Sequence, residues 1–128
     1  MSDVTKNVLI IDDSSMVRMY YREALVAAGF SVSEALNGLE GLEKVLTAPA
    51  DILIVDINMP KMDGLTFLHA LRKQQQPIAA IPALVTSTEA APGDRAAAID
   101  AGANYYLVKP VSQDTLVQYV RLLAGVPA

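Results

Sequence analysis

The sequence predicts a single α/β domain in which a parallel sheet of five strands carries helices on both faces. The chain has 128 residues, a length typical of one domain. Short apolar runs alternate with amphipathic segments five times along it. Continuous apolar runs are typical of strands covered on both faces, as in parallel sheets. A strand followed by a helix, repeated along the chain, favours a sheet with helices on both sides.

Five segments have the character of strands. Residues 30–33 alternate between apolar and polar side chains, which indicates a strand at the edge of the sheet. The other four are continuous apolar runs and are expected to be covered on both faces. These runs are Val8–Ile11, Ile52–Val55, Ala83–Val85 and Tyr105–Val108.

Between the strands, apolar residues recur at helical spacing and predict five helices. Gly29 follows the first stripe and Gly102 follows the fourth, and both supply the C-terminal stop that glycine commonly provides. The fourth stripe consists of small residues. The stripes cover residues 17–28, 39–46, 65–71, 96–101 and 116–123.

Composition excludes several classes of function. The chain has no cysteine, which excludes disulfides, thiolate catalysis and cysteine-ligated metals, and its single histidine, His69, excludes a multi-histidine zinc site. The net charge of −4 disfavours a nucleic-acid partner, because contacts with phosphates dominate that affinity. The longest nearly apolar stretch, residues 78–85, is too short to span a membrane, and residues 1–7 lack a signal-peptide core. We therefore expect a cytoplasmic protein without a membrane span.

Polar side chains follow four of the predicted strands. Because ligands of open α/β sheets bind outside the carboxyl ends of the strands, these residues are expected to converge on one site. The first strand ends at Asp12-Asp13, the third at Asp56, the fourth at Thr86-Ser87 and the fifth at Lys109-Pro110.

These residue types together indicate phosphoryl transfer onto a carboxylate. Three converging carboxylates repel one another unless a cation is present, and oxygen ligands without histidine or cysteine favour Mg²⁺. The ammonium of Lys109 and the hydroxyl of Thr86 suit a phosphoryl group. Asp56 is the best acceptor because it ends a central strand.

Each of these features has a simpler interpretation when taken alone. Asp12, Asp13 and Ser14 are good caps for the first helix. The segment from Asp56 to Pro60 has the composition of an ordinary turn, and a lone lysine is usually solvated. The shared position at the carboxyl ends of the strands favours the functional interpretation.

In combination these motifs resemble the response-regulator receiver family, the CheY-like proteins, over about residues 7–123. The residues that carry the resemblance are Asp12-Asp13, the segment from Asp56 to Gly64, Thr86-Ser87 and Lys109-Pro110. The resemblance implies a doubly wound, flavodoxin-like (βα)5 fold with strand order 2-1-3-4-5. It also implies one receiver domain over residues 1–128, with no output domain.

The resemblance assigns a role to each residue of the acidic site. Asp56 matches the phosphoacceptor, and Lys109 matches the lysine that pairs with the phosphoryl group. Asp13, Asp56 and the backbone carbonyl of Asn58 match the ligands of Mg²⁺. Asp12 matches the acid that holds the metal through water.

The resemblance also implies a conformational switch. Thr86 matches the hydroxyl that moves to the phosphoryl oxygen, and Tyr106 matches the aromatic residue that turns inward when this hydroxyl moves. Ser87 then occupies a position where the family usually has a small residue. The peptide bond before Pro110 is expected to be cis.

The implied function is that of a response regulator in two-component signalling. A sensor histidine kinase or a phosphotransfer protein supplies the phosphoryl group, and a target protein reads the face made by the fourth helix, fifth strand and fifth helix. The chain would promote its own phosphorylation and dephosphorylation and would not be a turnover enzyme. A stand-alone protein of a chemotaxis-like or phosphorelay type is expected; the alternative is a receiver cut from a longer regulator.

Three other functions are disfavoured. A flavin or nucleotide binder needs a Gly-rich phosphate loop after the first strand, where this chain has Asp12 and Asp13. A phosphatase that forms an aspartyl phosphate usually has an acid two residues after the nucleophile, where this chain has Asn58. A degenerate receiver that only binds partners would have lost its acceptor or its acidic pair.

Overall fold

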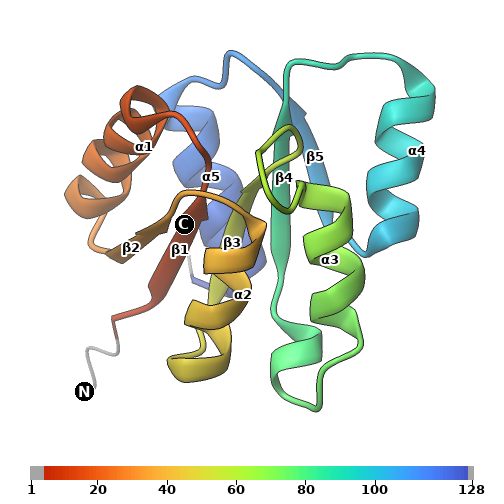
Figure 1. The fold of residues 1–128 in the computed structure, drawn as a ribbon. Coiled ribbons are helices and arrows are strands. Elements are labelled where there is room, and N and C mark those ends of the chain that lie inside the picture. The colour runs from red at the N-terminus through yellow and green to blue at the C-terminus, as the bar shows by residue number, and fades with distance from the viewer. Residues whose placement is uncertain (1–4, 127–128) are drawn as a thin grey trace.

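The structure, a computed structural model, describes residues 5–126 and confirms the predicted α/β architecture (Figure 1). All neighbouring strands pair in parallel, in the order β2-β1-β3-β4-β5 that the resemblance implied. The order reverses between β1 and β3, which places a crevice at their carboxyl ends. The strands are β1 (Asn7–Ile11), β2 (Ser31–Ala35), β3 (Ile52–Asp56), β4 (Ala83–Ser87) and β5 (Tyr105–Val108).

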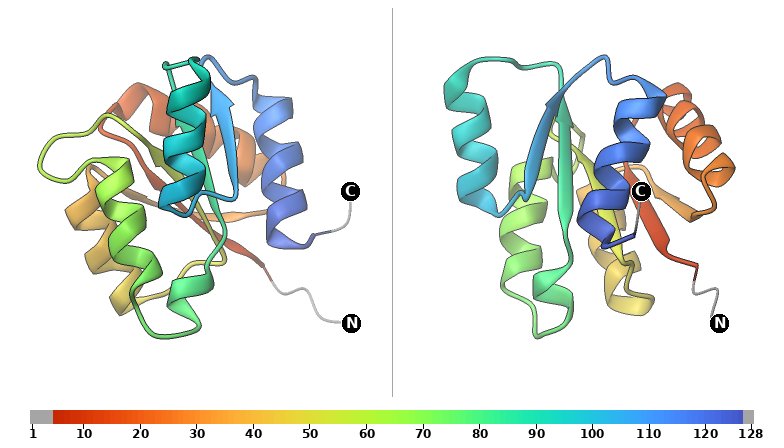
Figure 2. Two further views of the ribbon diagram at one scale, coloured as in Figure 1. Left: turned by 90° about the vertical axis from the view of Figure 1, so that its right-hand side faces the viewer. Right: turned by 180° about the vertical axis from the view of Figure 1, so that it is seen from behind.

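Two helices cover one face of the sheet and three cover the other. In the view of Figure 1, α1 and α5 pack behind the sheet and α2, α3 and α4 in front of it, and the reversed view on the right of Figure 2 brings α5 to the front. A short 3₁₀ helix, η1 (Ile78–Ala80), precedes β4. The helices are α1 (Ser15–Ala27), α2 (Gly38–Thr47), α3 (Gly64–Arg72), α4 (Pro92–Ala101) and α5 (Gln113–Ala124).

Polar side chains fix the start of four helices. Ser14, Asn37, Asp63 and Ser112 each accept a hydrogen bond from a backbone N–H in the first turn of α1, α2, α3 and α5. Because Ser14 caps α1, the carboxylates of Asp12 and Asp13 are not needed for this role.

The fourth helix begins earlier than predicted. The small-residue stripe predicted a helix over residues 96–101, whereas α4 begins at Pro92. Proline suits the first turn of a helix because its missing N–H would have no partner there. No side-chain cap precedes α4 among the described residues, and this absence hid the helix start from sequence reasoning.

The strand side chains alternate between two apolar layers, as expected for extended backbone. One layer packs under α2, α3 and α4, and the other under α1 and α5. The first layer contains Leu9, Ile11, Leu53, Val55, Ala83, Val85 and Tyr106. The second contains Val8, Ile10, Ile52, Ile54 and Leu84.

The two edges of the sheet are β2 and β5, as the strand order implied. The segment 30–33 was expected at an edge, and its residues 31–33 lie in β2. The run Tyr105–Val108 was expected to be covered on both faces, and Tyr106 packs in one apolar layer while Tyr105 and Leu107 pack against the other, with only Val108 at the strand end 39% exposed. The ring of Tyr105 stacks on Tyr119 of α5, with ring centroids 4.5 Å apart, so aromatic packing gives this edge its apolar character.

Arg72, at the end of α3, holds together the amino-terminal ends of β4 and β5. Its guanidinium donates hydrogen bonds to the backbone carbonyls of Ala79, Ile81 and Gly102 and to Oδ1 of Asn104, at distances of 2.6–3.0 Å. Gly102 has a φ of 118°, and a Cβ added there would lie 2.7 Å from Cγ of Arg72. This one side chain therefore links α3, η1 and the turn between α4 and β5.

Replacing Arg72 with methionine should destabilise the fold. The substitution keeps much of the apolar stem but leaves several carbonyl groups without a donor, which should lower the free energy of unfolding by about 2–4 kcal/mol. Urea unfolding monitored by circular dichroism measures this change. The control is Lys73→Met at the exposed neighbouring position, which should change stability by less than about 0.5 kcal/mol. Equal stability of the two variants would contradict the structural role of Arg72.

Candidate functional site

Three carboxylates converge at the carboxyl ends of β1 and β3. Asp12 follows β1, Asp56 ends β3, and these two strands are neighbours in the sheet. Asp12, Asp13 and Asp56 each offer an oxygen atom within 4.8 Å of the others. Asp12 is 1% and Asp56 6% exposed, whereas Asp13 is open to solvent. The predicted convergence of these carboxylates is confirmed.

Lys109 bridges the two buried carboxylates. Its Nζ donates to Oδ2 of Asp12 at 3.0 Å and to Oδ1 of Asp56 at 3.1 Å. The side chain is 16% exposed, which excludes the interpretation of a solvated lysine. Burial acts to lower the pKa of Lys109, but the bonds and charges of Asp12 and Asp56 outweigh burial and raise it. The lysine therefore stays charged at neutral pH.

The site keeps an excess of negative charge. Burial raises the pKa of Asp56 above its ordinary value, the charge of Asp12 raises it further, and Lys109 offsets only part of the effect. One oxygen of Asp12 already accepts a hydrogen bond from the backbone N–H of Ser14. The three carboxylates, of which Lys109 bonds to two, offer a set of oxygen ligands that fits a hard divalent cation such as Mg²⁺.

The loop after β3 approaches Asp56 closely. The N–H of Gly64 donates to the carbonyl of Ile57 at 2.8 Å, and a Cβ on Gly64 would lie only 2.3 Å from the carbonyl oxygen of Asp56. Only glycine leaves room for this turn. Asn58 is exposed in the same loop, and the role of its carbonyl as a metal ligand stays a prediction.

Thr86 and Tyr106 lie on opposite faces of the sheet. Leu84 belongs to the layer under α1 and α5, and Val85 and Tyr106 belong to the layer under α2, α3 and α4. By alternation along β4, Thr86 faces α1 and α5, while Ser87 lies on the face of Tyr106. Thr86 is the register partner of Asp56 in the sheet, so their side chains share one face. The movement of Thr86 toward a phosphoryl group, and of Tyr106 after it, stays a prediction.

Ser87 is the hydroxyl that connects to Tyr106. Its Oγ accepts a hydrogen bond from the backbone N–H of Glu89 at 3.0 Å. The hydroxyl of Tyr106 donates to the backbone carbonyl of the same Glu89 at 2.6 Å. Sequence reasoning treated Ser87 only as a small residue. The two-residue period along 83–87 is the signal that could have separated it from Thr86.

The Thr86 hydroxyl is fully buried and has no hydrogen-bond partner among residues 5–126. The phenol of Tyr21, on α1 and 2% exposed, is close to it. Burial raises the pKa of Tyr21, and the neighbouring Thr86 hydroxyl acts to lower it. Thr86 thus contacts α1, away from the α4 face.

Aromatic contacts join the three elements of the expected target face. The guanidinium carbon of Arg95, on α4, lies 5.4 Å from the ring centroid of Tyr106 and 6.0 Å from that of Tyr105. The hydroxyl groups of Tyr105 and Tyr119 are 3.2 Å apart. The peptide bond between Lys109 and Pro110 is cis, in agreement with the expectation.

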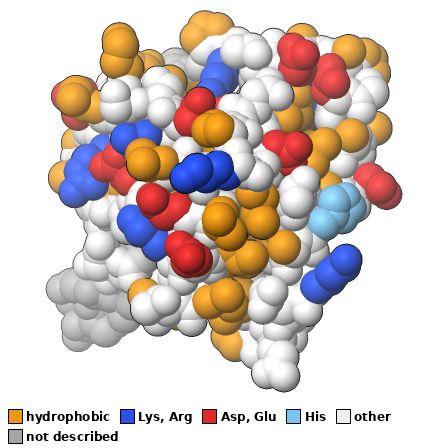
Figure 3. All heavy atoms as spheres, viewed as in Figure 1, with side chains coloured by type: hydrophobic (Ala, Val, Ile, Leu, Met, Phe, Trp, Pro, Cys, Tyr) orange, Lys and Arg blue, Asp and Glu red, His pale blue; other side chains and the backbone are white. Residues whose placement is uncertain are grey.

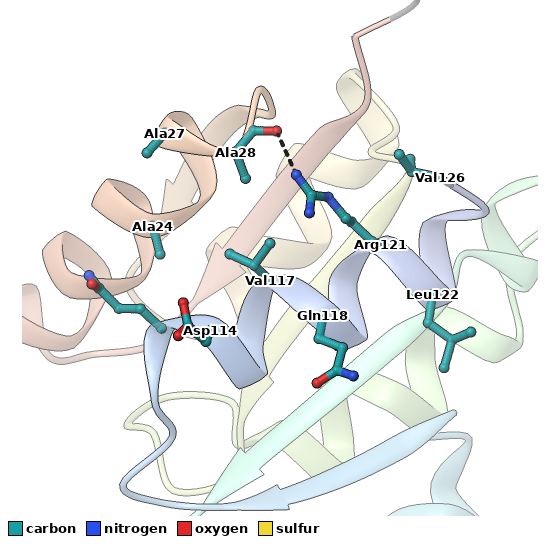
Figure 4. A pocket seen from close by; sticks show the side chains of 10 residues that line it. Ala24, Ala27, Ala28, Asp114, Val117, Gln118, Arg121, Leu122 and Val126 are labelled. Carbon is teal, nitrogen blue, oxygen red and sulfur yellow. Dashed lines mark hydrogen bonds between the residues drawn. The ribbon is translucent and has the colours of Figure 1, made fainter. Parts of the chain in front are cut away.

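Two surface pockets lie beside α1. The larger, of about 650 Å³, is a groove between α1 and α5 that contains none of the predicted site residues (Figure 4). The other, of about 500 Å³, is lined by α1 side chains, Thr88 and the segment Lys109–Val111. This second pocket borders Lys109, the lysine that bonds to Asp12 and Asp56.

Comparison with known proteins agrees with this geometry. Residues 8–121 match the family model of the response regulator receiver domain. The structure is similar to that of the chemotaxis protein CheY4 of Vibrio cholerae, with 34% identity, a TM-score of 0.86 and coverage of 94% of this chain and 99% of that one. A putative response regulator from Chloroflexus aurantiacus has 30% identity and a TM-score of 0.89, covering 95% of this chain and 99% of that one.

Curated relatives are longer than this chain. The transcriptional regulatory protein PrrA of Mycobacterium leprae is 38% identical over 91% of this chain and 48% of its own length. The sensor histidine kinase CheAY of Helicobacter pylori is 40% identical over 89% of this chain and 14% of its own length. The chain thus spans about half or less of these relatives. No helix within residues 5–126 is long and apolar enough to cross a membrane.

Replacing Asp56 with asparagine should stabilise the protein at neutral pH in the absence of divalent cations. An acid whose pKa is raised on folding binds its proton more tightly in the folded state, so its contribution to stability falls as pH rises through that pKa. Asp56→Asn removes this loss and should raise the free energy of unfolding by about 1 kcal/mol at neutral pH.

Urea unfolding with a chelator present, at neutral pH and again near the ordinary pKa of an aspartate, measures the effect. The gain should shrink toward acid pH, and the exposed control Asp100→Asn should show no such gain. A variant less stable than the wild type at neutral pH would contradict the excess of negative charge at this site.

Proposed function

The chain belongs to the response regulator receiver domain family, and we propose that it accepts a phosphoryl group on Asp56 in a reaction that requires Mg²⁺. The observation that carries this proposal is the bridge that Lys109 makes to Asp12 and Asp56 at the carboxyl ends of the central strands. A nucleophilic carboxylate, an adjacent fixed ammonium and further carboxylates suited to a hard cation are the groups that phosphoryl transfer needs.

The donor is a phosphohistidine on a kinase or phosphotransfer protein. An oxygen of Asp56 attacks the phosphorus in line, forming a P–O bond as the P–N bond breaks. The electron pair of the broken bond leaves with the imidazole nitrogen, which takes up a proton. Lys109 is placed to neutralise charge on the transferred oxygens. Attack of water on the phosphorus later releases phosphate and restores Asp56.

Asp12, Asp13, Asp56 and the backbone carbonyl of Asn58 would hold the Mg²⁺ ion. When bound, the ion supplies positive charge that neutralises the phosphoryl oxygens. The geometry supports this assignment, because three carboxylates offer oxygen atoms within 4.8 Å of one another while Lys109 bonds to only two of them.

Thr86 is proposed to transmit the change, because it shares a face with Asp56 and its buried hydroxyl has no hydrogen-bond partner within residues 5–126. When the Thr86 hydroxyl donates to a phosphoryl oxygen on Asp56, the end of β4 moves, and with it the segment in which Ser87 is bonded to Glu89. The carbonyl of Glu89 is the acceptor of Tyr106, so this segment and the Tyr106 side chain rearrange together. The result is a shift between two packings of the α4-β5-α5 face, which a target protein reads.

The exposed side chains of α1 suit the approach of the donor protein. Met16 is 81% exposed, Met19 62% and Tyr20 42%, and Met16 and Tyr20 line the pocket that leads to Lys109. The chain would not be a turnover enzyme, since Asp56 carries its own product. The match covers 99% of the CheY4 chain but 48% of PrrA, so a stand-alone protein and a receiver within a longer regulator are the two alternatives.

Incubation with acetyl phosphate and Mg²⁺ should add one phosphoryl group to the protein. Intact-mass spectrometry detects the addition, which should disappear in Asp56→Asn and when a chelator removes Mg²⁺, because the acceptor or the charge-neutralising ion is then lost. Asp100→Asn should be modified like the wild type. Undiminished phosphorylation of Asp56→Asn would reject the assignment of the acceptor.

Thr86→Val and Ser87→Ala should separate the two candidate hydroxyls. Both variants keep Asp56, so both should still be phosphorylated. The aromatic NMR signals of Tyr106 should shift on phosphorylation in the wild type and in Ser87→Ala, but by less than about half as much in Thr86→Val, which has no hydroxyl to bond the phosphoryl group. The opposite pattern would assign the role to Ser87.

A further inference from the structure

Two arginines of α1 share one carboxylate on the neighbouring strand. Nε of Arg18 lies 2.8 Å from Oε1 of Glu34, and Nη1 of Arg22 lies 2.9 Å from Oε2 of the same residue. Charged side chains of both signs gather over α1 and β2, on the left of Figure 3. Burial acts to raise the pKa of Glu34, but the bonds from the two arginines outweigh burial and lower it, so this carboxylate stays charged.

Only Arg18 reaches from this pair to the acidic site. Its Nη1 donates to the backbone carbonyl of Asp12 at 2.8 Å. The Arg18 side chain is 11% exposed, compared with 48% for Arg22, which contacts the backbone of β2 but not the Asp12-Asp13 turn. The guanidinium of Arg18 thus joins Glu34 of β2 to the peptide that links Asp12 to Asp13.

This peptide determines where two of the three carboxylates lie. The peptide unit is planar, so fixing the Asp12 carbonyl fixes the plane from which Asp13 begins. The Asp12 N–H donates to the carbonyl of Ala35 at 3.1 Å, so both sides of Asp12 are tied to the β2 region. Asp13 is exposed, and its carboxylate accepts no hydrogen bond within residues 5–126. The position of this carboxylate therefore depends on the backbone of the turn.

We propose that Arg18 is a positioning residue for the magnesium ligands and that Glu34 orients Arg18. Arg18 holds the Asp12-Asp13 turn in the geometry that lets its carboxylates meet a cation together with Asp56. Partners that orient the ligands of a metal in this way typically contribute ten- to a hundredfold to its affinity. The proposal rests on the magnesium site of the proposed function and deepens it.

The sign of the effect distinguishes positioning from simple electrostatics. If Arg18 acted only as a nearby positive charge, its removal would tighten the binding of a cation. If it positions the ligands, its removal weakens binding, even though the site then becomes more negative. Arg18→Lys keeps the charge but loses the fork that meets two acceptors at once, so it should also weaken binding.

Calorimetric titration with Mg²⁺ alone tests the proposal on the wild type, Arg18→Gln, Arg18→Lys and Arg22→Gln. Arg18→Gln and Arg18→Lys should raise the Kd for Mg²⁺ by roughly tenfold or more. Arg22→Gln removes a bond to the same Glu34 without touching the turn, and its Kd should stay within about twofold of the wild type.

Urea unfolding of the same proteins separates affinity from stability. A purely structural role would lower the unfolding midpoint of the Arg18 variants and leave the Kd of the folded protein unchanged, which would overturn the inference. So would a Kd for Arg18→Gln equal to or tighter than that for Arg22→Gln. If the wild type does not bind Mg²⁺, the proposed magnesium site itself is rejected. If the wild type binds Mg²⁺ and the Arg18 variants bind it equally well, only the role of Arg18 is rejected.

Discussion

The rest of the structure depends on the excess of negative charge at the carboxyl ends of β1 and β3. Asp12 and Asp56 are almost fully buried, and Lys109 is the one cation that bonds to both within the described chain. Burying an uncompensated charge opposes folding. The fully apolar interior of β3 and its neighbours offsets this cost and keeps the two carboxylates side by side. The fold thereby maintains a site that favours the binding of a cation, and of a phosphoryl group whose negative charge that cation neutralises.

Alternation along the strands divides this site between two faces of the sheet. Lys109 and Thr86 lie on the side of α1 and α5, while Ser87 and Tyr106 lie on the side of α3 and α4. A difference of one residue in β4 therefore decides whether a hydroxyl faces the helix that a donor protein would approach or the helix that a target protein would read. The backbone of Glu89 bonds to both Ser87 and Tyr106, so a single residue connects the end of β4 to Tyr106.

The fold and the acidic residues could be predicted because each strand is a compact apolar run that ends on a polar residue. The same signal could not separate Thr86 from Ser87, since two adjacent hydroxyls follow one apolar run and β4 continues through both. The bonds of Arg18 and Arg72 could not be predicted either. They join helix residues to loop carbonyls in other parts of the fold, and no local spacing encodes such contacts.

The two arginines also explain where the molecule can change shape. Arg72 ties the amino-terminal ends of β4 and β5 to α3, and Arg18 ties the Asp12-Asp13 turn to β2. The backbone between Ser87 and Pro92 has weaker restraints: its residues 88–92 are exposed, and α4 begins without a side-chain cap in the described chain. Segments with few buried contacts open at the lowest free energy. A new bond at Thr86 would therefore be expressed at the start of α4, because Arg18 holds the Asp12-Asp13 turn and Arg72 holds the opposite ends of β4 and β5.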